Sequence, residues 1–107
     1  MKKVFLAGSV ILAVFLVSAG TAFAQSAGEA TYKAKCQMCH GATGMADSGA
    51  GKAMKVKPVT DPDVKKLPEA EMITVTTNGS GKMPAYKGKL TDAEIKDSVT
   101  YFRSFIK

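Results

Sequence analysis

The sequence of 107 residues contains no tryptophan, one histidine and two cysteines. A tetrahedral structural zinc site needs about four Cys or His ligands, so a chain with three such residues cannot build one alone. Beyond position 24, the only aromatic residues are Tyr32, Tyr86, Tyr101, Phe102 and Phe105. A small domain with so few large side chains often depends on a disulfide, a metal or a cofactor for stability. We therefore expect something other than aromatic side chains to fill the centre of the fold.

The sequence also lacks a dense block of basic residues, an internal repeat and a low-complexity tract. Its 15 Lys and Arg residues exceed its 9 acidic residues and give a formal net charge of +6, but they are dispersed along the chain. Dedicated nucleic-acid patches usually concentrate such residues in short runs. A dispersed positive charge is better suited to steering the protein toward acidic protein partners.

Residues 1–24 have the pattern of a secretory signal peptide. Two lysines precede an uncharged run of 14 residues (Val4 to Val17), and residues 22–24 form an A-x-A cleavage signal. The run is shorter than the roughly 20 residues of a membrane-spanning helix, which makes an uncleaved anchor the less favoured alternative. We expect cleavage after Ala24, export to the periplasm or an equivalent space, and a domain of residues 25–107 without stable membrane insertion.

The first half of that domain predicts short helices and a loop. Good helix formers favour a helix from Ala27 to Met38. Gly, Ala and Ser dominate residues 41–51 and favour a loop there. Thr60-Asp61-Pro62 is typical of a helix start and predicts a short helical turn that reaches Leu67.

The second half contains one clear element and one ambiguous element. Thr91 and Glu94 form a capping-box pair before an apolar stripe with helical spacing, which predicts a helix from about Asp92 to Phe105. Residues 68–77 begin with helix formers but continue with five β-branched residues. Since β-branched side chains favour strands, these residues alone leave helix and strand about equally favoured.

Residues 36–40 read Cys-Gln-Met-Cys-His and contain both cysteines and the only histidine. A thioredoxin-type site needs a strand before the motif, whereas the residues before Cys36 favour a helix. A structural disulfide that closes so small a loop would stabilise the fold little. In the C-x-x-C-H motif both thiols form thioethers to haem and the histidine reaches the iron. The motif therefore predicts covalent haem attachment at Cys36 and Cys39, with His40 as an iron ligand.

The other axial ligand must come from a different residue type, because the chain has no second histidine. Methionine is the soft alternative and raises the reduction potential. Met38 and Met45 lie too close to the motif to reach the opposite face of the ring, while Met54 and Met72 remain candidates. Met83 is favoured, since it lies between a glycine-rich stretch and a proline, in a loop of defined course that could press a thioether onto a flat face.

The CQMCH motif and the segment GKMPAYKGKLTDAEIKDSVTYFRSF, whose methionine follows His40 by 43 residues, together resemble the small bacterial class I cytochromes c. The likeness is to the cytochrome c6, c551 and c553 group and covers essentially all of residues 25–107. It implies an all-α fold of about three to five helices around one covalently bound haem c. It also implies that the N- and C-terminal helices cross and that residues 69–78 form a helix.

The resemblance further implies roles for individual residues. Gly28 and Tyr32 correspond to the small and aromatic residues of the N-terminal helix. Tyr101, with Val99 or Phe102 nearby, corresponds to their partner on the C-terminal helix. The backbone carbonyl of a proline often accepts the N–H of the haem-binding histidine in this family, and Pro58 is the expected acceptor.

The implied function is that of a soluble, monomeric, mono-haem carrier of single electrons rather than an enzyme. Its expected partners are redox proteins, such as an oxidase, a reductase or a dehydrogenase, with acidic docking surfaces. Lys82, Lys87 and Lys89 could surround an exposed haem edge and steer these partners, although ordinary solubility explains them equally well. The alternatives are a haem enzyme or a gas or redox sensor with a displaceable Met83, and a thiol-disulfide oxidoreductase.

Overall fold

The computed structural model describes residues 19–107, with side chains described from Ala27 onward. The helices are α1 (Ala19–Lys35), α2 (Gln37–His40), α3 (Gly49–Ala53), α4 (Pro62–Lys65), α5 (Glu69–Asn78) and α6 (Asp92–Arg103). The described residues contain no β-strand, only two isolated bridges at 80–83 and 87–90. The all-α fold is therefore confirmed. The described residues form six helices instead of about three to five, because α2, α3 and α4 are each only about one turn long.

The expected signal peptide lies mostly outside the described residues. Its A-x-A signal at residues 22–24 falls in the first part of α1, where only the backbone is described, so cleavage after Ala24 stays a prediction. Between residues 19 and 107, no helix is both long and apolar enough to cross a membrane.

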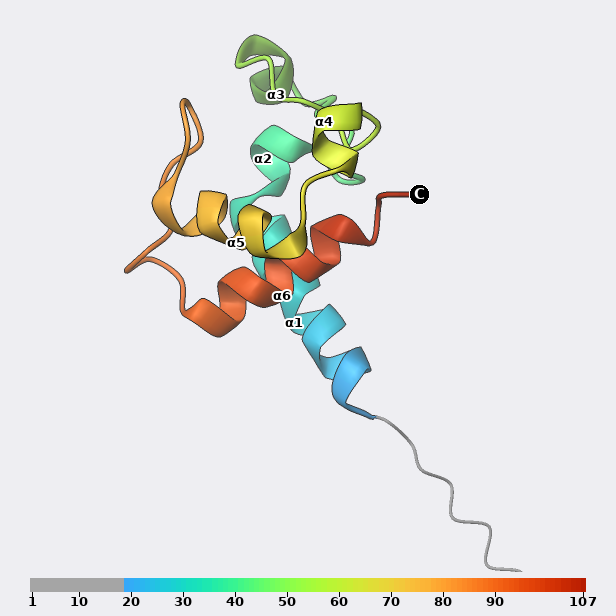
Figure 1. Cartoon of the computed structure of the whole chain (residues 1–107), viewed down its shortest axis with the longest axis vertical. Helices are drawn as coiled ribbons and strands as arrows, with labels where there is room; N and C mark the ends of the chain where they lie inside the picture. The colour runs from blue at the N-terminus through green and yellow to red at the C-terminus, as the bar shows by residue number, and fades with distance from the viewer. Residues whose placement is uncertain (1–18) are drawn as a thin grey trace, which may run out of the picture.

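Helices α1 and α6 cross and pack against each other, as the resemblance implied (Figure 1). At the crossing, Gly28 lies so close to α6 that a Cβ atom built on it would overlap the backbone carbonyl oxygen of Asp97. One turn later, the ring of Tyr32 packs against Tyr101, with 5.3 Å between ring centroids. The absence of a side chain at Gly28 is therefore what allows the two helices to approach this closely.

The helix expected from Ala27 to Met38 is divided in two by Cys36. The backbone N–H of Cys36 still donates to the carbonyl of Tyr32 at 2.8 Å, and the carbonyl of Cys36 accepts from His40 at 3.0 Å. The chain thus turns at Cys36 and resumes as α2, which carries the rest of the motif. The loop expected at residues 41–51 is also shorter than predicted, because the Ser48 hydroxyl caps α3 by accepting from the Gly51 N–H at 3.0 Å.

Residues 69–78 form helix α5, as the resemblance implied, despite their β-branched side chains. The hydroxyls of Thr74, Thr76 and Thr77 each donate to a carbonyl four residues earlier, at 2.7 to 3.0 Å. Threonine is accommodated in a helix when its hydroxyl can make this bond. Gly79 follows with φ of 77° and ends the helix.

The predicted helix starts at α4 and α6 are confirmed. Asp61 caps α4 by accepting from the Asp63 N–H at 2.8 Å. Thr91 and Glu94 form the expected capping box of α6. Helix α6 ends at Arg103, two residues before the predicted Phe105, because the last backbone N–H groups bond three residues back in a tighter turn.

The fully enclosed core of the described domain is small. Its buried hydrophobic residues are Tyr32, Ala46, Val59, Met72, Ile95 and Val99. Helix α5 packs against α6 on the side of this core, and Arg103 links α6 to the segment before α5 by donating to the Leu67 carbonyl at 2.7 Å. Because so few side chains are buried, much of the apolar surface in the middle of the fold is not covered by other protein atoms.

Candidate haem site

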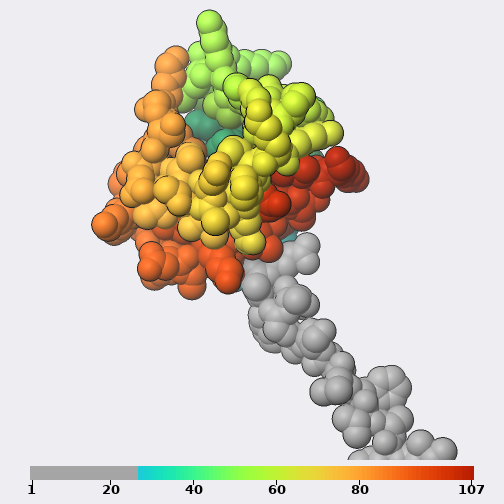
Figure 2. Space-filling view, in the orientation of Figure 1, coloured from blue at the N-terminus to red at the C-terminus, as the bar shows by residue number. Residues whose placement is uncertain are grey.

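A cavity of about 320 Å³ lies at the centre of the helices. Figure 2 shows the hollow on the surface: atoms of the segment near residue 40 form its floor, between the segment near residue 80 and residues 50 to 65. Apolar side chains from α4, α5, α6 and the connecting segments line it: Val56, Val64, Leu67, Val75, Val99 and Phe102. All of these except Val99 are only half-buried or partly exposed. The volume lies in the usual range of ligand and cofactor pockets, about 300–1,000 Å³.

A second cavity of about 220 Å³ brings together all four residues predicted to hold a haem. Cys36, Cys39, His40 and Met83 each contribute to its lining. Three of the four also line the larger cavity, the exception being Cys39. His40 and Met83 are 43 positions apart in the sequence, yet both line the same two cavities.

His40 is held by its backbone and by one aromatic neighbour. Its carbonyl accepts from the Ala46 N–H at 2.8 Å, and its ring meets Phe102 edge to face with 5.3 Å between centroids. Tyr32 fixes the next residue by donating its hydroxyl to the Gly41 carbonyl at 2.6 Å. Burial lowers the pKa of His40, which favours the neutral imidazole that binds metals.

The Nδ1 atom of His40 is buried and has no hydrogen-bond partner within the described part of the chain. The expected bond to Pro58 is therefore not seen. The Pro58 carbonyl instead accepts from the Asp61 N–H at 2.9 Å, in the turn that starts α4. Buried polar atoms are seldom left without a partner, so the imidazole has coordinating or bonding capacity that these residues do not use.

Cys36 and Cys39 are free thiols, each half-buried. Desolvation by burial, with a smaller contribution from Cys39, raises the pKa of the Cys36 thiol to about 11. A reactive cysteine usually has a lowered pKa, because the thiolate is the nucleophile. Cys36 is thus poorly suited to spontaneous thiol-disulfide exchange. Both cysteines line the smaller cavity, which a covalently attached haem would adjoin.

Met83 lies in a loop that is tied back to the end of α5. The backbones of Ser80 and Met83 exchange two hydrogen bonds of 2.9 and 3.1 Å. Tyr86 then donates its backbone N–H to the Thr76 carbonyl at 3.0 Å. A Cβ atom at Gly79 would lie 2.9 Å from the Met83 carbonyl oxygen, so the loop needs glycine at that position. These contacts define the course of the loop that carries Met83.

The other methionines are placed less favourably as ligands. Met38 and Met45 are 73% and 42% exposed and line neither cavity. Met54 lines only the smaller cavity. Met72 lines only the larger one, is buried, and has its sulfur 3.7 Å from the Arg103 guanidinium. Met83 lines both cavities together with His40.

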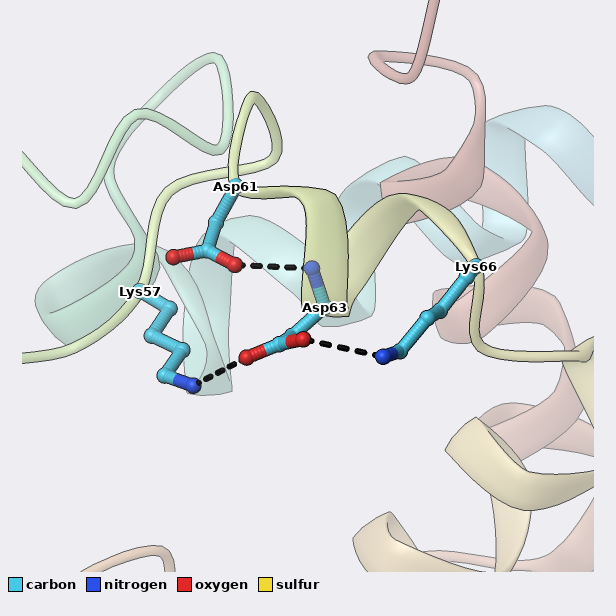
Figure 3. A network of polar contacts seen from close by, with 4 residues as sticks. All are labelled: Lys57, Asp61, Asp63 and Lys66. Carbon is cyan, nitrogen blue, oxygen red and sulfur yellow. Dashed lines mark hydrogen bonds and ion pairs between the residues drawn. The ribbon is translucent and has the colours of Figure 1, made fainter.

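Two residues at the site are not singled out by the sequence. Tyr86 lines the smaller cavity and donates its hydroxyl to the Lys35 carbonyl at 3.0 Å, across 51 positions of sequence. This bond joins the Met83 loop to the end of α1. Lys57 lines the larger cavity and pairs with Asp63 at 2.9 Å (Figure 3), and no motif marks it. The spacing of residues within a motif carries no information on such contacts between distant segments.

A covalently bound haem fits this set of residues. Two thiols stand beside a histidine with an unpartnered buried nitrogen, a methionine lies in the same cavity, and the surrounding side chains are mostly apolar and incompletely covered. Cysteine, histidine and methionine are the residue types through which c-type cytochromes attach and coordinate haem.

Known proteins resemble the chain over most of its length. Residues 23–102 match the family described as "Cytochrome C oxidase, cbb3-type, subunit III". The chain is 37% identical over 76 residues to cytochrome c6 of Leptolyngbya boryana, which covers 71% of this chain and 86% of that protein. It is 32% identical over 83 residues to cytochrome c-551 of Halorhodospira halochloris, which covers 78% of this chain and 98% of that protein.

The fold has a solved counterpart as well. The structure named KustC0563 c-type cytochrome superposes with a TM-score of 0.68 and 28% sequence identity, over 75% of this chain and 98% of that one. The resemblance recognised in the CQMCH motif and the Met83 loop is thus confirmed by relatives and by fold. The chain belongs to the cytochrome c family.

Proposed function

We propose that this chain is an exported, mono-haem electron carrier in which Cys36 and Cys39 anchor the haem and His40 and Met83 are its axial ligands. The observation that carries the proposal is the lining of the smaller cavity by all four residues. The names of the relatives, cytochrome c6 and cytochrome c-551, support the same class of protein. Haem bound in this way would supply one-electron exchange between the ferric and ferrous states.

The residues of the chain contribute attachment, orientation and exclusion of water. The turn at Cys36 keeps the two thiols near the His40 imidazole. Tyr32, through its bond to the Gly41 carbonyl, and Phe102, through its ring contact, limit the movement of this imidazole. Gly79 and Tyr86 hold the loop of Met83. If His40 and Met83 both bound the iron, no coordination position would be left for a substrate, which favours a carrier over a haem enzyme or a gas sensor.

A thiol-disulfide oxidoreductase is disfavoured for a separate reason. Such enzymes need an exposed thiol with a low pKa, whereas burial raises the pKa of Cys36. The chain in front of the motif is helix α1, not the strand that a thioredoxin-type site requires.

The ligand assignment is tested by Met83→Ala, with Met54→Ala as the matched control at the same cavity. We expect Met83→Ala to keep its covalent haem, to lose the red absorption band typical of ferric Met–Fe ligation, and to lower the reduction potential by more than about 59 mV, a tenfold change in a one-electron equilibrium. Met54→Ala should keep the band and the potential.

Visible spectra and potentiometric titration of the three proteins distinguish the outcomes. Loss of the band in Met54→Ala but not in Met83→Ala would assign the ligand to Met54. A wild-type protein without a reversible one-electron couple would contradict the electron-carrier function itself.

A further inference from the structure

The loop that carries Met83 is held at both of its ends by helix α5. At its start, the Gly79 N–H donates to the Val75 carbonyl at 2.8 Å, and at its end the Tyr86 N–H donates to the Thr76 carbonyl at 3.0 Å. The loop therefore leaves α5 and returns to its last turn, as the orange segment beside α5 in Figure 1 shows. These bonds fix the ends of the loop, but they do not hold it against α1 and α2.

One side-chain hydrogen bond provides that link. The Tyr86 hydroxyl donates to the Lys35 carbonyl at 3.0 Å. Among the hydrogen bonds between described residues, no other joins residues 79–90 to α1 or α2. Lys35 is the last residue of α1 and directly precedes Cys36, so its carbonyl is one of those that a helix leaves without an internal partner. The bond thus connects the loop of the proposed axial ligand to the start of the attachment motif.

Packing does little to hold the loop in place. Met83 itself is half-buried, while the residues on either side of it are exposed: Gly81, Lys82, Pro84 and Ala85. Segments with few buried apolar contacts open locally at low cost in free energy. A specific contact such as the Tyr86 bond can therefore decide how much of the time the loop is closed.

We propose that the Tyr86 hydroxyl keeps Met83 on the haem iron by holding the ligand loop against the end of α1. This inference rests on the proposed function and adds a form of regulation to the same site. Tyr86 is a positioning residue in this account, because it acts through Met83 and does not coordinate the iron. It determines how readily Met83 gives up its coordination position to another ligand.

The expected consequence concerns external ligands of the iron. Such a ligand can bind only in the fraction of molecules in which Met83 has left the iron, and its apparent affinity rises in proportion to that fraction. Removal of the Tyr86 hydroxyl takes away a bond that is made only when the loop is closed. The net contribution of one hydrogen bond corresponds to roughly a two- to twelvefold change in an equilibrium constant.

The test titrates the ferric haem protein with imidazole and follows the loss of the Met–Fe absorption band. We expect Tyr86→Phe, which keeps the ring, to bind imidazole at least about threefold more tightly than the wild-type protein. Tyr101→Phe is the matched control and should bind imidazole as the wild-type protein does. The Tyr101 ring packs against Tyr32 and Phe105, and its hydroxyl forms no hydrogen bond with the described residues.

A second comparison separates the control of Met83 from an effect on the entry of imidazole, because Tyr86 also lines the smaller cavity. The change Tyr86→Phe is made again in the Met83→Ala variant, where no methionine has to be displaced. The imidazole affinity should then be the same with and without the Tyr86 hydroxyl. Such a double-mutant cycle measures the coupling between the two residues directly.

Three results would overturn the proposal: equal imidazole affinity of Tyr86→Phe and the wild-type protein, an equal increase in Tyr101→Phe, or an increase of the same size in the Met83→Ala background. Circular dichroism verifies that each variant is folded. If Met83→Ala kept the Met–Fe band, the ligand assignment would fail, and the role of Tyr86 with it. If Met83→Ala lost the band and any of the three results were found, only the role of Tyr86 would be rejected.

Discussion

At the scale of single residues, Cys36 and Cys39 are anchoring groups rather than redox groups in this account. Both lie next to His40 on the wall of the cavity, and the raised pKa of Cys36 disfavours a reactive thiolate. Their spacing matters because two thioethers must reach one edge of the haem while the next residue reaches the iron.

The variant with Cys36→Ala and Cys39→Ala should therefore lose covalent haem completely. We expect no haem staining on a denaturing gel and a loss of stable helical structure by circular dichroism, since the cavity would lack the group that covers its apolar lining. Met38→Ala, a change at an exposed position between the two cysteines, is the control and should keep both. Normal folding of the double variant without haem would show that haem is not part of the core.

The motif residues could be predicted from sequence because their chemistry requires a fixed local spacing. Met83 could be favoured over four other methionines through its glycine and proline neighbours. Lys57 and Tyr86 could not be found in this way. They line the cavities only because the tertiary fold brings distant segments together, as the bond from Tyr86 to Lys35 across 51 positions shows.

At the scale of secondary-structure elements, the crossing of α1 and α6 positions the motif. Gly28 provides the close approach, with the Asp97 carbonyl directly opposite and the Tyr101 Cβ atom 3.2 Å from where a Cβ would stand. Helix α2 begins directly after Cys36, the residue that follows α1, so the packing of α1 against α6 determines where the segment that contains His40 begins.

Gly28→Ala should destabilise the protein, although alanine favours helices by about 1 kcal/mol over glycine. The added methyl group meets backbone, which cannot turn aside, and overpacking typically costs about 1–3 kcal/mol before that gain is subtracted. Gly49→Ala is the matched control, because a Cβ atom there meets nothing within 4 Å. Denaturant unfolding should show that Gly28→Ala is less stable than the wild-type protein and that Gly49→Ala is as stable as the wild-type protein or slightly more stable. Equal stability of the two variants would contradict the close-packed crossing.

The elements differed in how far sequence could predict them. Helix α6 carries a capping box and an apolar stripe, and both are local signals. Helix α5 could not be decided from its residues, because the threonine hydroxyls that satisfy its carbonyls act only once the helix exists. The split of α1 from α2 was missed, since helix propensity does not report the turn at Cys36.

At the scale of the whole molecule, the fold is a set of short helices around a cavity rather than around a large hydrophobic core. The buried hydrophobic residues among those described are few, and several apolar residues of the lining stay only half-buried. Burial of apolar surface is worth about 25 cal/mol per Å², so a planar apolar group in this cavity would add substantially to stability. This arrangement agrees with the shortage of aromatic residues in the sequence.

The central claim is that one haem is covalently bound to this chain, and the mass of the intact protein tests it most directly. The protein should be produced in a host that attaches haem to exported proteins, purified, and measured by mass spectrometry under denaturing conditions. We predict the mass of residues 25–107 increased by that of a single haem. A mass equal to that of the polypeptide alone, with or without an internal disulfide, would contradict the account.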